Sequence, residues 1–376
     1  MAKSNTRIRN LMKEIDDILE SGMLSGFRGT PDGHLGGKYV QALESQFRDY
    51  FGVKYAIALN SATAALHASL LGIEIGVGDE VIVSPFTFSS SASCVLMVGA
   101  TPVFADIQDD IFCIDPKCIE TLITPRTKAI IPVHLCGHPA DMVAIMRLAV
   151  EYGLDVIEDA AQSIGAIYRG KYAGTIGDCG VFSFNQSKHI NTGEGGMLIT
   201  NDDIIARIVR AVRNHGEISD PELKVVGYNY RLCEIEAALA SEQFKQLDEM
   251  TAHRIKLTNL MSEGLRGIKG FTPPVTSPDC KHVFYTYAVK FDEALVGMTR
   301  DDFQDKMIEK GIYFGKGYVK PLYLLPIYQQ FGYKEGICPV TERMWREIVV
   351  TDIVKHPKTE EDICGIIDIV RDIVNG

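Results

Sequence analysis

The sequence of 376 residues has no apolar run that approaches the length needed to cross a membrane. Its first residues lead into a charged helical pattern and not into a signal sequence, so we expect no membrane partner. It also has no excess of basic residues, because the formal net charge is -11 at pH 7. This charge argues against nucleic acid or an anionic membrane surface as the main partner.

The cysteines have no metal-site or redox spacing. The nine cysteines are scattered and form no C-x-x-C pair, so we expect reduced core thiols in a cytoplasmic protein and no zinc site. Internal repeats and low-complexity tracts are also missing. Hydrophobic residues make up 46% of the chain and charged residues 23%, which is typical of a globular protein. The length exceeds what one core usually supports, so one large and one small domain are expected.

Short strand-like runs alternate with helical patterns in the first half of the chain. The strand-like runs lie at 55–60, 80–84, 101–106, 129–134 and 155–159, and helical patterns at 62–71 and 141–152. This alternation predicts an α/β fold with a mostly parallel sheet buried between helices.

The pattern changes after Gly216. A helical pattern at 234–263, a strand-like run at 284–291 and helices at 300–310 and 359–374 predict a smaller α+β unit. We therefore expect a large domain with an N-terminal helical arm at residues 1–235. A long connecting helix and a small C-terminal domain are expected at 236–376.

Lys188 lies between a strand-like run that includes Ser183 and a glycine-rich turn. Asp159 ends another strand-like run, at 155–159, and Gln162 follows it. Ligands of parallel sheets bind at the carboxyl ends of the strands, which is where His134, Asp159 and the turn at 60–63 fall. A lysine for the aldehyde, a carboxylate for the ring nitrogen and a serine for the phosphate are what pyridoxal phosphate requires of a protein. The pattern therefore indicates a cofactor and a class of reaction.

Each of these residues also has a plainer interpretation. A lysine before a glycine-rich turn is usually a surface residue, and Asp159 could simply cap the next helix. Ser61 could be an ordinary N-cap of the helix that begins with Ala62 and Thr63. The free N–H groups of that first turn also suit a phosphate, and capping and phosphate binding are compatible.

Seven short motifs follow one another along the chain. They are Gly36-Gly37-Lys38-Tyr39-Val40-Gln41-Ala42-Leu43-Glu44, Asn60-Ser61-Ala62-Thr63-Ala64-Ala65-Leu66, Gly78-Asp79-Glu80-Val81-Ile82, Glu158-Asp159-Ala160-Ala161-Gln162, the Ser183/Lys188 segment, Arg213-Asn214-His215-Gly216 and Gly227-Tyr228-Asn229-Tyr230-Arg231. In these motifs and their order the chain resembles the DegT/StrS-type sugar aminotransferases, which are fold-type-I pyridoxal-phosphate enzymes related to aspartate aminotransferase. The resemblance covers nearly the whole chain and implies a large sheet of the seven-stranded type.

The resemblance also implies a role for each residue. Lys188 would bond to the cofactor aldehyde and then move a proton as base and acid, and Asp159 would keep the ring nitrogen protonated. The other cofactor contacts would come from Ala62, Thr63 and Ser183 at the phosphate, Gln162 at the ring hydroxyl and Phe88 stacked on the ring, with Phe86 as a rival. Two residues, Arg231 and Tyr318, are expected to bind substrate. In the resembling family the segment containing Asn229 and Arg231 crosses to the neighbouring subunit, where Asn229 reaches the cofactor phosphate. A homodimer with shared sites is therefore expected.

The expected reaction moves an amino group from an amino acid, L-glutamate, to a ketosugar carried on a nucleotide. Pyridoxamine 5'-phosphate would be the intermediate form of the cofactor. The stretch 315–323 departs from the resembling family, because Gly317 and Tyr323 replace two histidines found in many nucleotide-sugar members. The alternatives are therefore a cyclitol or small keto-phosphate as acceptor, a cofactor-dependent sugar dehydratase, or a non-catalytic regulator. Related dehydratases carry histidine in place of the lysine, and a regulator would not need Lys188, Asp159 and Ser183 together.

Overall fold

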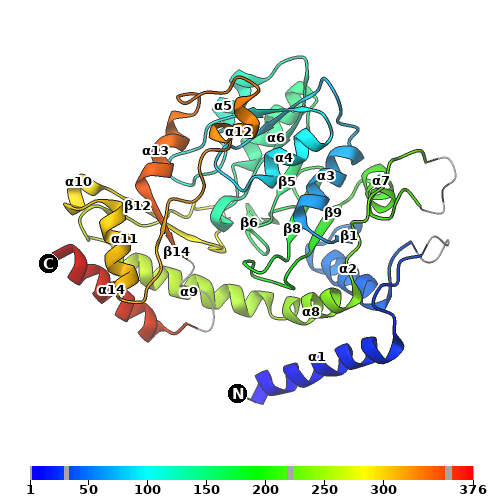
Figure 1. The fold of residues 1–376 in the computed structure, drawn as a ribbon, viewed down its shortest axis with the longest axis horizontal. Coiled ribbons are helices and arrows are strands. Elements are labelled where there is room, and N and C mark those ends of the chain that lie inside the picture. The colour runs from blue at the N-terminus through cyan, green and yellow to red at the C-terminus, as the bar shows by residue number, and fades with distance from the viewer. Residues whose placement is uncertain (1, 29–33, 218–219, 221–222, 352–357, 376) are drawn as a thin grey trace.

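The computed structural model describes residues 2–28, 34–217, 220, 223–351 and 358–375 (Figure 1). Its central sheet contains β1 (Tyr55–Leu59), β9 (Gly196–Thr200), β8 (Cys179–Ser183), β5 (Asp155–Asp159), β4 (Thr127–Ile131), β2 (Glu80–Val83) and β3 (Thr101–Phe104), in that spatial order. β9 is antiparallel to both of its neighbours, and the remaining neighbours pair in parallel. The expected α/β fold with a mostly parallel sheet of seven strands is confirmed.

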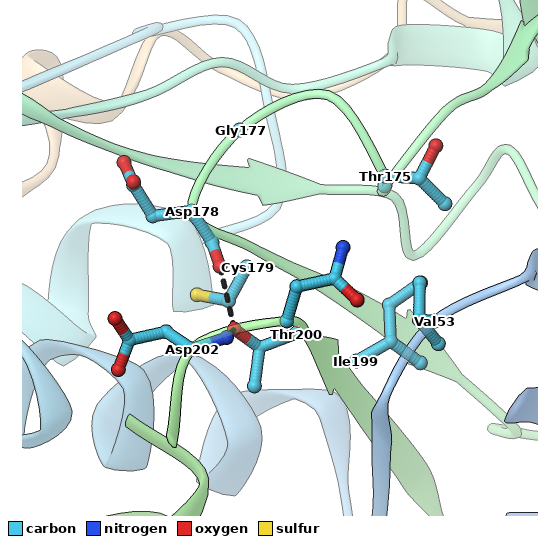
Figure 2. Close-up of a pocket in the computed structure, with 10 residues that line it drawn as sticks. Val53, Thr175, Gly177, Asp178, Cys179, Ile199, Thr200 and Asp202 are labelled. Atoms are coloured by element: carbon cyan, nitrogen blue, oxygen red, sulfur yellow. Dashed lines mark hydrogen bonds between the residues drawn. The ribbon is translucent and has the colours of Figure 1, made fainter. Parts of the chain in front are cut away.

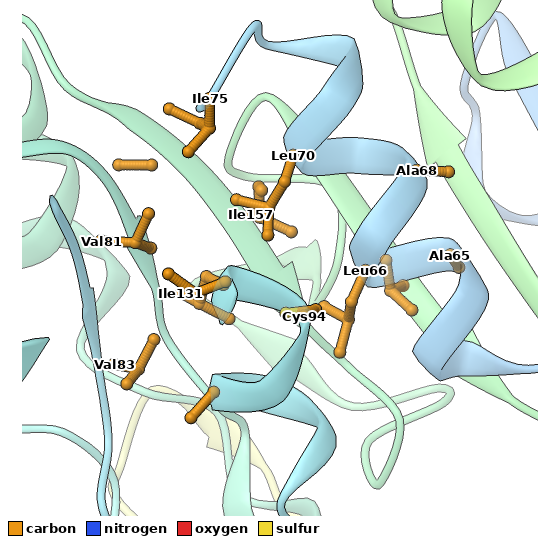
Figure 3. Packing of buried hydrophobic residues seen from close by; sticks show 14 of the residues in the cluster. Ala65, Leu66, Ala68, Leu70, Ile75, Val81, Val83, Cys94, Ile131 and Ile157 are labelled. Atoms are coloured by element: carbon orange, nitrogen blue, oxygen red, sulfur yellow. The ribbon is translucent and has the colours of Figure 1, made fainter. Parts of the chain in front are cut away.

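Helices cover both faces of this sheet. One face packs against α3 (Ala62–Gly72), α4 (Ser90–Met97) and α7 (Asp203–Arg213), and Figure 3 shows the side chains of α3 and α4 over the strands. The other face packs against α2 (Lys38–Phe51), α5 (Pro116–Leu122), α6 (Met142–Tyr152) and α8 (Glu234–Phe244). Successive strand residues point to opposite faces, which is why Ile131 and its neighbour Ile130 belong to different core clusters. A sheet buried on both faces explains the continuous apolar strand runs.

A second sheet of four antiparallel strands lies in the C-terminal part. It contains β10 (Phe271–Thr272), β12 (Tyr287–Phe291), β14 (Ile348–Thr351) and β13 (Gly315–Lys316). Its core cluster includes side chains of α9 (Leu247–Leu265), α11 (Arg300–Glu309) and α14 (Glu360–Asn375). This is the α+β unit that the sequence predicts.

The remaining elements are short or peripheral. They are α1 (Ala2–Ser21), β6 (Ile167–Tyr168), β7 (Lys171–Tyr172), β11 (Cys280–Lys281), α10 (Glu293–Val296), α12 (Pro326–Gln329), α13 (Pro339–Glu347) and the 3-10 turns η1 (Leu135–Gly137) and η2 (Leu322–Leu324). α1 extends away from the rest of the ribbon at the lower edge of Figure 1 and meets the other elements near its C-terminal end. None of the helices within the described ranges is both long enough and apolar enough to span a bilayer.

Three expected boundaries need correction. The single helix expected over 234–263 is wrong, because α8 ends at Phe244 and α9 begins at Leu247 after a turn. The strand expected at 129–134 is β4, at 127–131, and the strand expected at 284–291 begins only at Tyr287.

The division after residue 235 stays a prediction. Packing crosses that position in two places. Phe244 of α8 belongs to a cluster with Phe47 of α2 on one face of the central sheet, and Tyr323 and Tyr328 belong to the cluster on the other face. The C-terminal half of the chain therefore contributes to the core of the large sheet as well as to its own.

Candidate active site

The site is built at one edge of the central sheet. β5 and β8 are parallel neighbours, with Asp159 opposite Val181, so Asp159 and Ser183 leave the sheet at the same edge. β1 runs in the same direction as β8, because both are antiparallel to β9 between them. The turn that leads from β1 into α3 therefore lies at this edge too, and a parallel bridge joins Ser61 to Gly195. The carboxyl ends of parallel strands are where such sheets bind ligands.

The first turn of α3 provides a site for an anion. Ser61 caps the helix, and its hydroxyl oxygen accepts a hydrogen bond from Ala64 N over 3.1 Å. The N–H groups of Ala62 and Thr63 belong to the first turn, where a helix has no acceptor of its own for them. Gly196 allows this turn to lie against β9, because a Cβ atom there would be 2.5 Å from Ser61 C and 2.6 Å from Ala62 N. The turn is therefore fixed in place with its donors directed outward.

Asp159 ends β5 and is buried, with only 4% of its surface exposed. Its Oδ2 accepts a hydrogen bond from Ser91 Oγ over 2.7 Å, and its Oδ1 accepts one from Ala161 N over 3.1 Å. The second bond is a local turn contact with the residue two positions on, and because β6 is the next element after β5, Asp159 caps no helix. The two bonds fix the orientation of the carboxylate at the sheet edge.

Gln162 and Tyr318 are brought together, although the sequence separates them widely. Gln162 Nε2 donates to Tyr318 Oη over 2.6 Å, and Gln162 Oε1 accepts from Cys136 N over 2.8 Å. Burial raises the pKa of the Tyr318 phenol well above its usual value, and the nearby Cys136 and Tyr285 raise it further. The hydroxyl accepts from Gln162 and keeps its own proton to donate to a bound molecule.

Lys188 lies in the loop between β8 and β9. Two backbone hydrogen bonds join the ends of this loop: Phe184 N donates to Gly195 O over 2.8 Å, and Gln186 N donates to Gly193 O over 2.9 Å. The side chain is half-buried, and its Nζ lies 4.1 Å from the centroid of the Tyr285 ring. This placement differs from that of an ordinary solvated surface lysine.

The next residue, His189, is buried, and burial followed by the charge of Arg254 lowers its pKa well below the usual value. A neutral His189 adds no positive charge beside Lys188. Its Nε2 lies 3.0 Å from the carbonyl oxygen of Val283 and serves as the donor.

Two nearby phenylalanines differ in exposure. Phe88 is 61% exposed, whereas Phe86 is fully buried and packs edge-on against Tyr318 with 5.8 Å between the ring centroids. A cofactor ring can stack only on an accessible face, so the geometry favours Phe88 over Phe86.

Asn229 and Arg231 lie on a segment that packs against its own chain. Asn229 is exposed, and its carbonyl oxygen accepts from Asn60 Nδ2 over 3.2 Å. Arg231 Nη1 donates to Asn214 Oδ1 over 3.0 Å. The segment therefore runs beside the turn that leads into α3, and its role in a neighbouring subunit stays a prediction.

The stretch 315–323 divides into core and site residues. Tyr323 is fully buried, and its hydroxyl donates to Glu342 Oε1 over 2.5 Å. Gly317 has a φ of +64°, and a Cβ atom there would be 2.7 Å from Trp345 O. Both residues that replace the histidines of the resembling family thus serve packing, and Tyr318 is the residue of the three that contacts the site.

A buried hydrogen bond between His134 and Glu158 joins β5 to the segment that follows β4. His134 Nε2 lies 2.8 Å from Glu158 Oε2, and both side chains are fully buried. Since Ala140 N donates to His134 Nδ1 over 3.0 Å, the ring proton is on Nε2 and is donated to Glu158. Glu158 also accepts from backbone N–H groups of residues 174, 176 and 177. Both ring nitrogens of His134 are thus occupied by contacts within the chain.

The open cavity in Figure 2, of about 280 Å³, is not the site. Its lining residues Gly177 and Asp178 precede β8, and Thr200 and Asp202 end or follow the antiparallel β9. It therefore lies at the opposite edge of the sheet from Asp159 and Ser183. Thr200 Oγ1 donates to Asp178 O there over 2.7 Å.

Sequence reasoning missed Ser91 and Tyr285, the partners of Asp159 and Lys188. No short motif joins either of them to the residue it contacts, and only the fold brings them together. Ser91 lies in the first turn of α4, a few residues after Phe88, and Tyr285 lies just before β12.

The fold and this site define a fold-type-I α/β enzyme, and comparison with known proteins gives the family. The family model of the DegT/DnrJ/EryC1/StrS aminotransferases matches residues 13–371, and the chain belongs to this family. It is a pyridoxal-phosphate-dependent aminotransferase, as the family and the solved structures of its members indicate.

Three similar proteins illustrate the relationship. GDP-perosamine synthase of Caulobacter vibrioides is 42% identical over 78% of this chain and 79% of its own length. The spore coat polysaccharide biosynthesis protein SpsC of Bacillus subtilis strain 168 is 36% identical over 97% of this chain and 94% of its own. The crystal structure of DesV from S. venezuelae has a TM-score of 0.90 and 33% identity, and the match covers 100% of this chain and 97% of that chain.

Proposed function

We propose that this protein binds pyridoxal 5'-phosphate at the described sheet edge and moves an amino group from L-glutamate to a ketosugar carried on a nucleotide diphosphate. The observation that carries the proposal is the convergence of a lysine, a buried carboxylate and a helix N-terminus at one edge of a parallel sheet. Asp159 ends β5, Ser183 ends β8, and the α3 turn lies beside them. Each of these groups matches one part of the cofactor.

The residues present fit the cofactor. The N–H groups of Ala62 and Thr63 would hold the phosphate with the Ser183 hydroxyl. That hydroxyl oxygen already accepts from Asn185 N over 3.2 Å, so its proton is free to be donated to the phosphate. Phe88 would cover one face of the ring.

When bound, pyridoxal phosphate supplies the electron sink that lets a proton leave the carbon carrying the amino group. The residues of the chain do the rest. Lys188 Nζ takes the proton from the α-carbon of the amino donor and gives it up again as the amine is transferred. The Asp159 carboxylate holds the proton on the ring nitrogen, and the Gln162–Tyr318 pair holds the ring hydroxyl side.

The names of two relatives support a sugar as acceptor. The relative from Caulobacter vibrioides is a GDP-perosamine synthase, and that from Bacillus subtilis belongs to spore coat polysaccharide biosynthesis. Tyr318 would reach the acceptor from the core side of the site. A cyclitol or a small keto-phosphate is the alternative acceptor, because Gly317 and Tyr323 stand where histidines are found in many nucleotide-sugar enzymes.

We further propose that two subunits share each site in a cytoplasmic homodimer. Asn229 and Arg231 would extend to the neighbouring subunit, where Asn229 reaches the phosphate and Arg231 offers its charge to a carboxylate or phosphate of the substrate. An arginine fork suits such an anion. The exposure of Asn229 leaves its side chain accessible to a partner.

The first prediction tests Lys188. Borohydride reduction of the protein with its cofactor should fix the cofactor mass on the peptide that contains Lys188, as read by mass spectrometry. Lys188→Ala should fold but lose transamination by several orders of magnitude, because one amine is both anchor and proton carrier. Lys171→Ala, an exposed lysine on β7, is the matched control and should keep both label and activity. A label on another lysine would overturn the proposal.

The acceptor is identified by a screen. The pyridoxamine form is prepared with L-glutamate and mixed separately with nucleotide-linked ketosugars, free cyclitol ketones and keto-phosphates, and the return of the pyridoxal spectrum is followed. We expect the fastest return with a nucleotide-linked ketosugar. A faster return with a cyclitol ketone or a keto-phosphate would replace that acceptor and leave the aminotransferase assignment intact.

A further inference from the structure

Residues 282–285, here called the strap, connect β11 to β12 and contact the loop that positions Gln162. His282 Nε2 donates to Cys136 O over 3.0 Å, and Val283 N donates to Gly137 O over 3.1 Å. Cys136 is the residue whose N–H holds Gln162 Oε1. The first half of the strap is thus attached to one side of the site.

The strap is also attached to the lysine loop. His189 Nε2 donates to Val283 O over 3.0 Å, directly beside Lys188. Ser187 Oγ lies 2.9 Å from Tyr285 Oη on the other side of the lysine. The residues that flank Lys188 are therefore both bonded to the strap.

The backbone of the strap is held in a conformation that it would not adopt freely. Phe284 has a φ of +47°, which is rare for an aromatic residue and persists only where the surroundings impose it. Arg254 Nη1 donates to Phe284 O over 3.1 Å and to Tyr285 O over 3.3 Å. The Phe284 ring stacks on His282 with 3.7 Å between centroids. These contacts fix the direction of the next side chain, Tyr285.

Gly137 permits this arrangement. A Cβ atom at Gly137 would lie 2.9 Å from Tyr285 N and 3.0 Å from Phe284 N, so another residue there would push the strap away. The close approach of η1 to the strap brings the Tyr285 ring over the lysine loop. Lys188 Nζ lies 4.1 Å from the ring centroid, well within the range of about 6 Å for a cation–π interaction.

We propose that Tyr285 is a further functional residue of this site, whose ring face binds the Lys188 ammonium whenever the lysine is not bonded to the cofactor. This inference rests on the proposed function. A lysine has a flexible four-carbon stem, and a freed amine would otherwise spread over many rotamers. Held on the ring after it has taken the proton, the ammonium stays beside the site to which it returns that proton.

The test uses the protein without cofactor, so that its readout does not depend on catalysis. The rate at which acetic anhydride acetylates Lys188 is measured by peptide mass spectrometry, with Lys171 as the internal reference. In Tyr285→Leu the amine loses its partner, and we expect acetylation to be about two- to fivefold faster than in the wild type. Tyr285→Phe keeps the ring and should keep the protection.

Tyr152→Leu is the matched control, because this tyrosine ends α6 and is 44% exposed. It should leave both the acetylation rate and turnover unchanged. Circular dichroism checks the fold, and Tyr285→Gln takes the place of Tyr285→Leu if the latter is unfolded. Equal acetylation of Lys188 with and without the ring would overturn the role of Tyr285.

The last measurement is the turnover of the enzyme with its cofactor bound. Tyr285→Leu should lower kcat more than it changes cofactor affinity, and Tyr285→Phe should lower it less. The borohydride label separates the two proposals. A label on Lys188 with unchanged acetylation in the ring variant overturns only the role of Tyr285, whereas a label on another residue overturns the proposed function itself.

Discussion

Both carboxylate oxygens of Asp159 accept a hydrogen bond, from Ser91 and from Ala161 N. Ser91 Oγ also lies 3.2 Å from Thr87 Oγ1, so it can donate there and accept from Asp159 if that residue becomes an amide. An asparagine can therefore keep the local hydrogen bonds while it removes the negative charge.

The second prediction follows from this geometry. Asp159→Asn should keep the melting temperature close to that of the wild type, because its hydrogen bonds survive. Turnover should fall at least about a hundredfold, since the ring nitrogen loses the charge that holds its proton. Cofactor affinity, measured by titration of the absorption spectrum, should change by less than about tenfold. Near-normal turnover would mean that Asp159 is not the partner of the ring.

Asp155 is a second carboxylate on β5, at the opposite end of the strand. Burial, followed by the charges of Asp178 and Asp202, raises its pKa to about 6. A pKa raised in the folded state means that ionisation disfavours the fold. Below about pH 4 the group is protonated in both states and costs nothing, and stability is lost as the pH rises through about 6.

The third prediction is a pH dependence of stability. Asp155→Asn should raise the free energy of unfolding at pH 8 by about 1 kcal/mol and should have little effect at pH 4. The expected gain is this small because solvent screens part of the charge of a half-buried carboxylate. Urea unfolding at the two pH values measures the difference. Asp372→Asn, an exposed carboxylate on α14, is the control and should be neutral at both. An equal effect of Asp155→Asn at both pH values would contradict the raised pKa of Asp155 in the folded protein.

At the scale of elements, the approach of β9 to the α3 turn is the contact that shapes the anion site. It depends on the missing side chain of Gly196. The methyl group of an alanine would have to displace the backbone of Ser61 and Ala62, close to the N–H groups that are proposed to hold the phosphate.

The fourth prediction is that Gly196→Ala weakens cofactor binding and lowers stability by about 1–3 kcal/mol, the usual cost of overpacking. Gly76→Ala is the matched control, because a Cβ atom there meets nothing within 4 Å. The test measures cofactor affinity and thermal unfolding of both variants and compares each with the wild type. Unchanged affinity in Gly196→Ala would show that the α3 turn does not hold the phosphate.

Elements with a strong pattern could be predicted from the sequence, and those set by tertiary contacts could not. The strands at β1, β2 and β5 and the helices α3 and α6 follow from apolar runs and caps. The break between α8 and α9 has no proline or glycine to mark it: residues 245 and 246 are Lys and Gln, both good helix formers. α8 packs on the central sheet and α9 on the second sheet, and the turn separates these two contacts.

The same limit applies to the site. Lys188, Asp159 and Ser183 stand in short motifs, so the sequence could suggest roles for them, and these roles stay predictions. Ser91 and Tyr285 meet their partners only through the fold, and no local pattern connects them.

At the scale of the whole molecule, the proposed sharing of sites gives the fifth prediction. Lys188→Ala and Arg231→Ala, each inactive, should partly restore activity when they are unfolded and reassembled together. A mixed dimer carries both changes in one site and neither in the other. Random pairing makes half of the dimers mixed, so activity should approach about a quarter of the wild type.

The control for complementation is Lys188→Ala mixed with Asp159→Asn, because both changes lie in the part of the site that a single chain supplies. In that mixed dimer each site keeps one defect, and no activity should return. Absence of rescue by Arg231→Ala despite proven subunit exchange would assign Arg231 to its own subunit or to no site.

The order of strands in the central sheet has a consequence for synthesis on the ribosome. β1 lies at the end of the sheet, and its neighbour there is β9. When β1 and α3 emerge, the strand that will hold β1 in the sheet has not yet been translated, and β1 stays without its neighbour until residues 60–195 have been synthesised. The nascent chain can pair β2, β3, β4 and β5 earlier. The part of the candidate site that lies between β1 and β9 therefore forms late in folding.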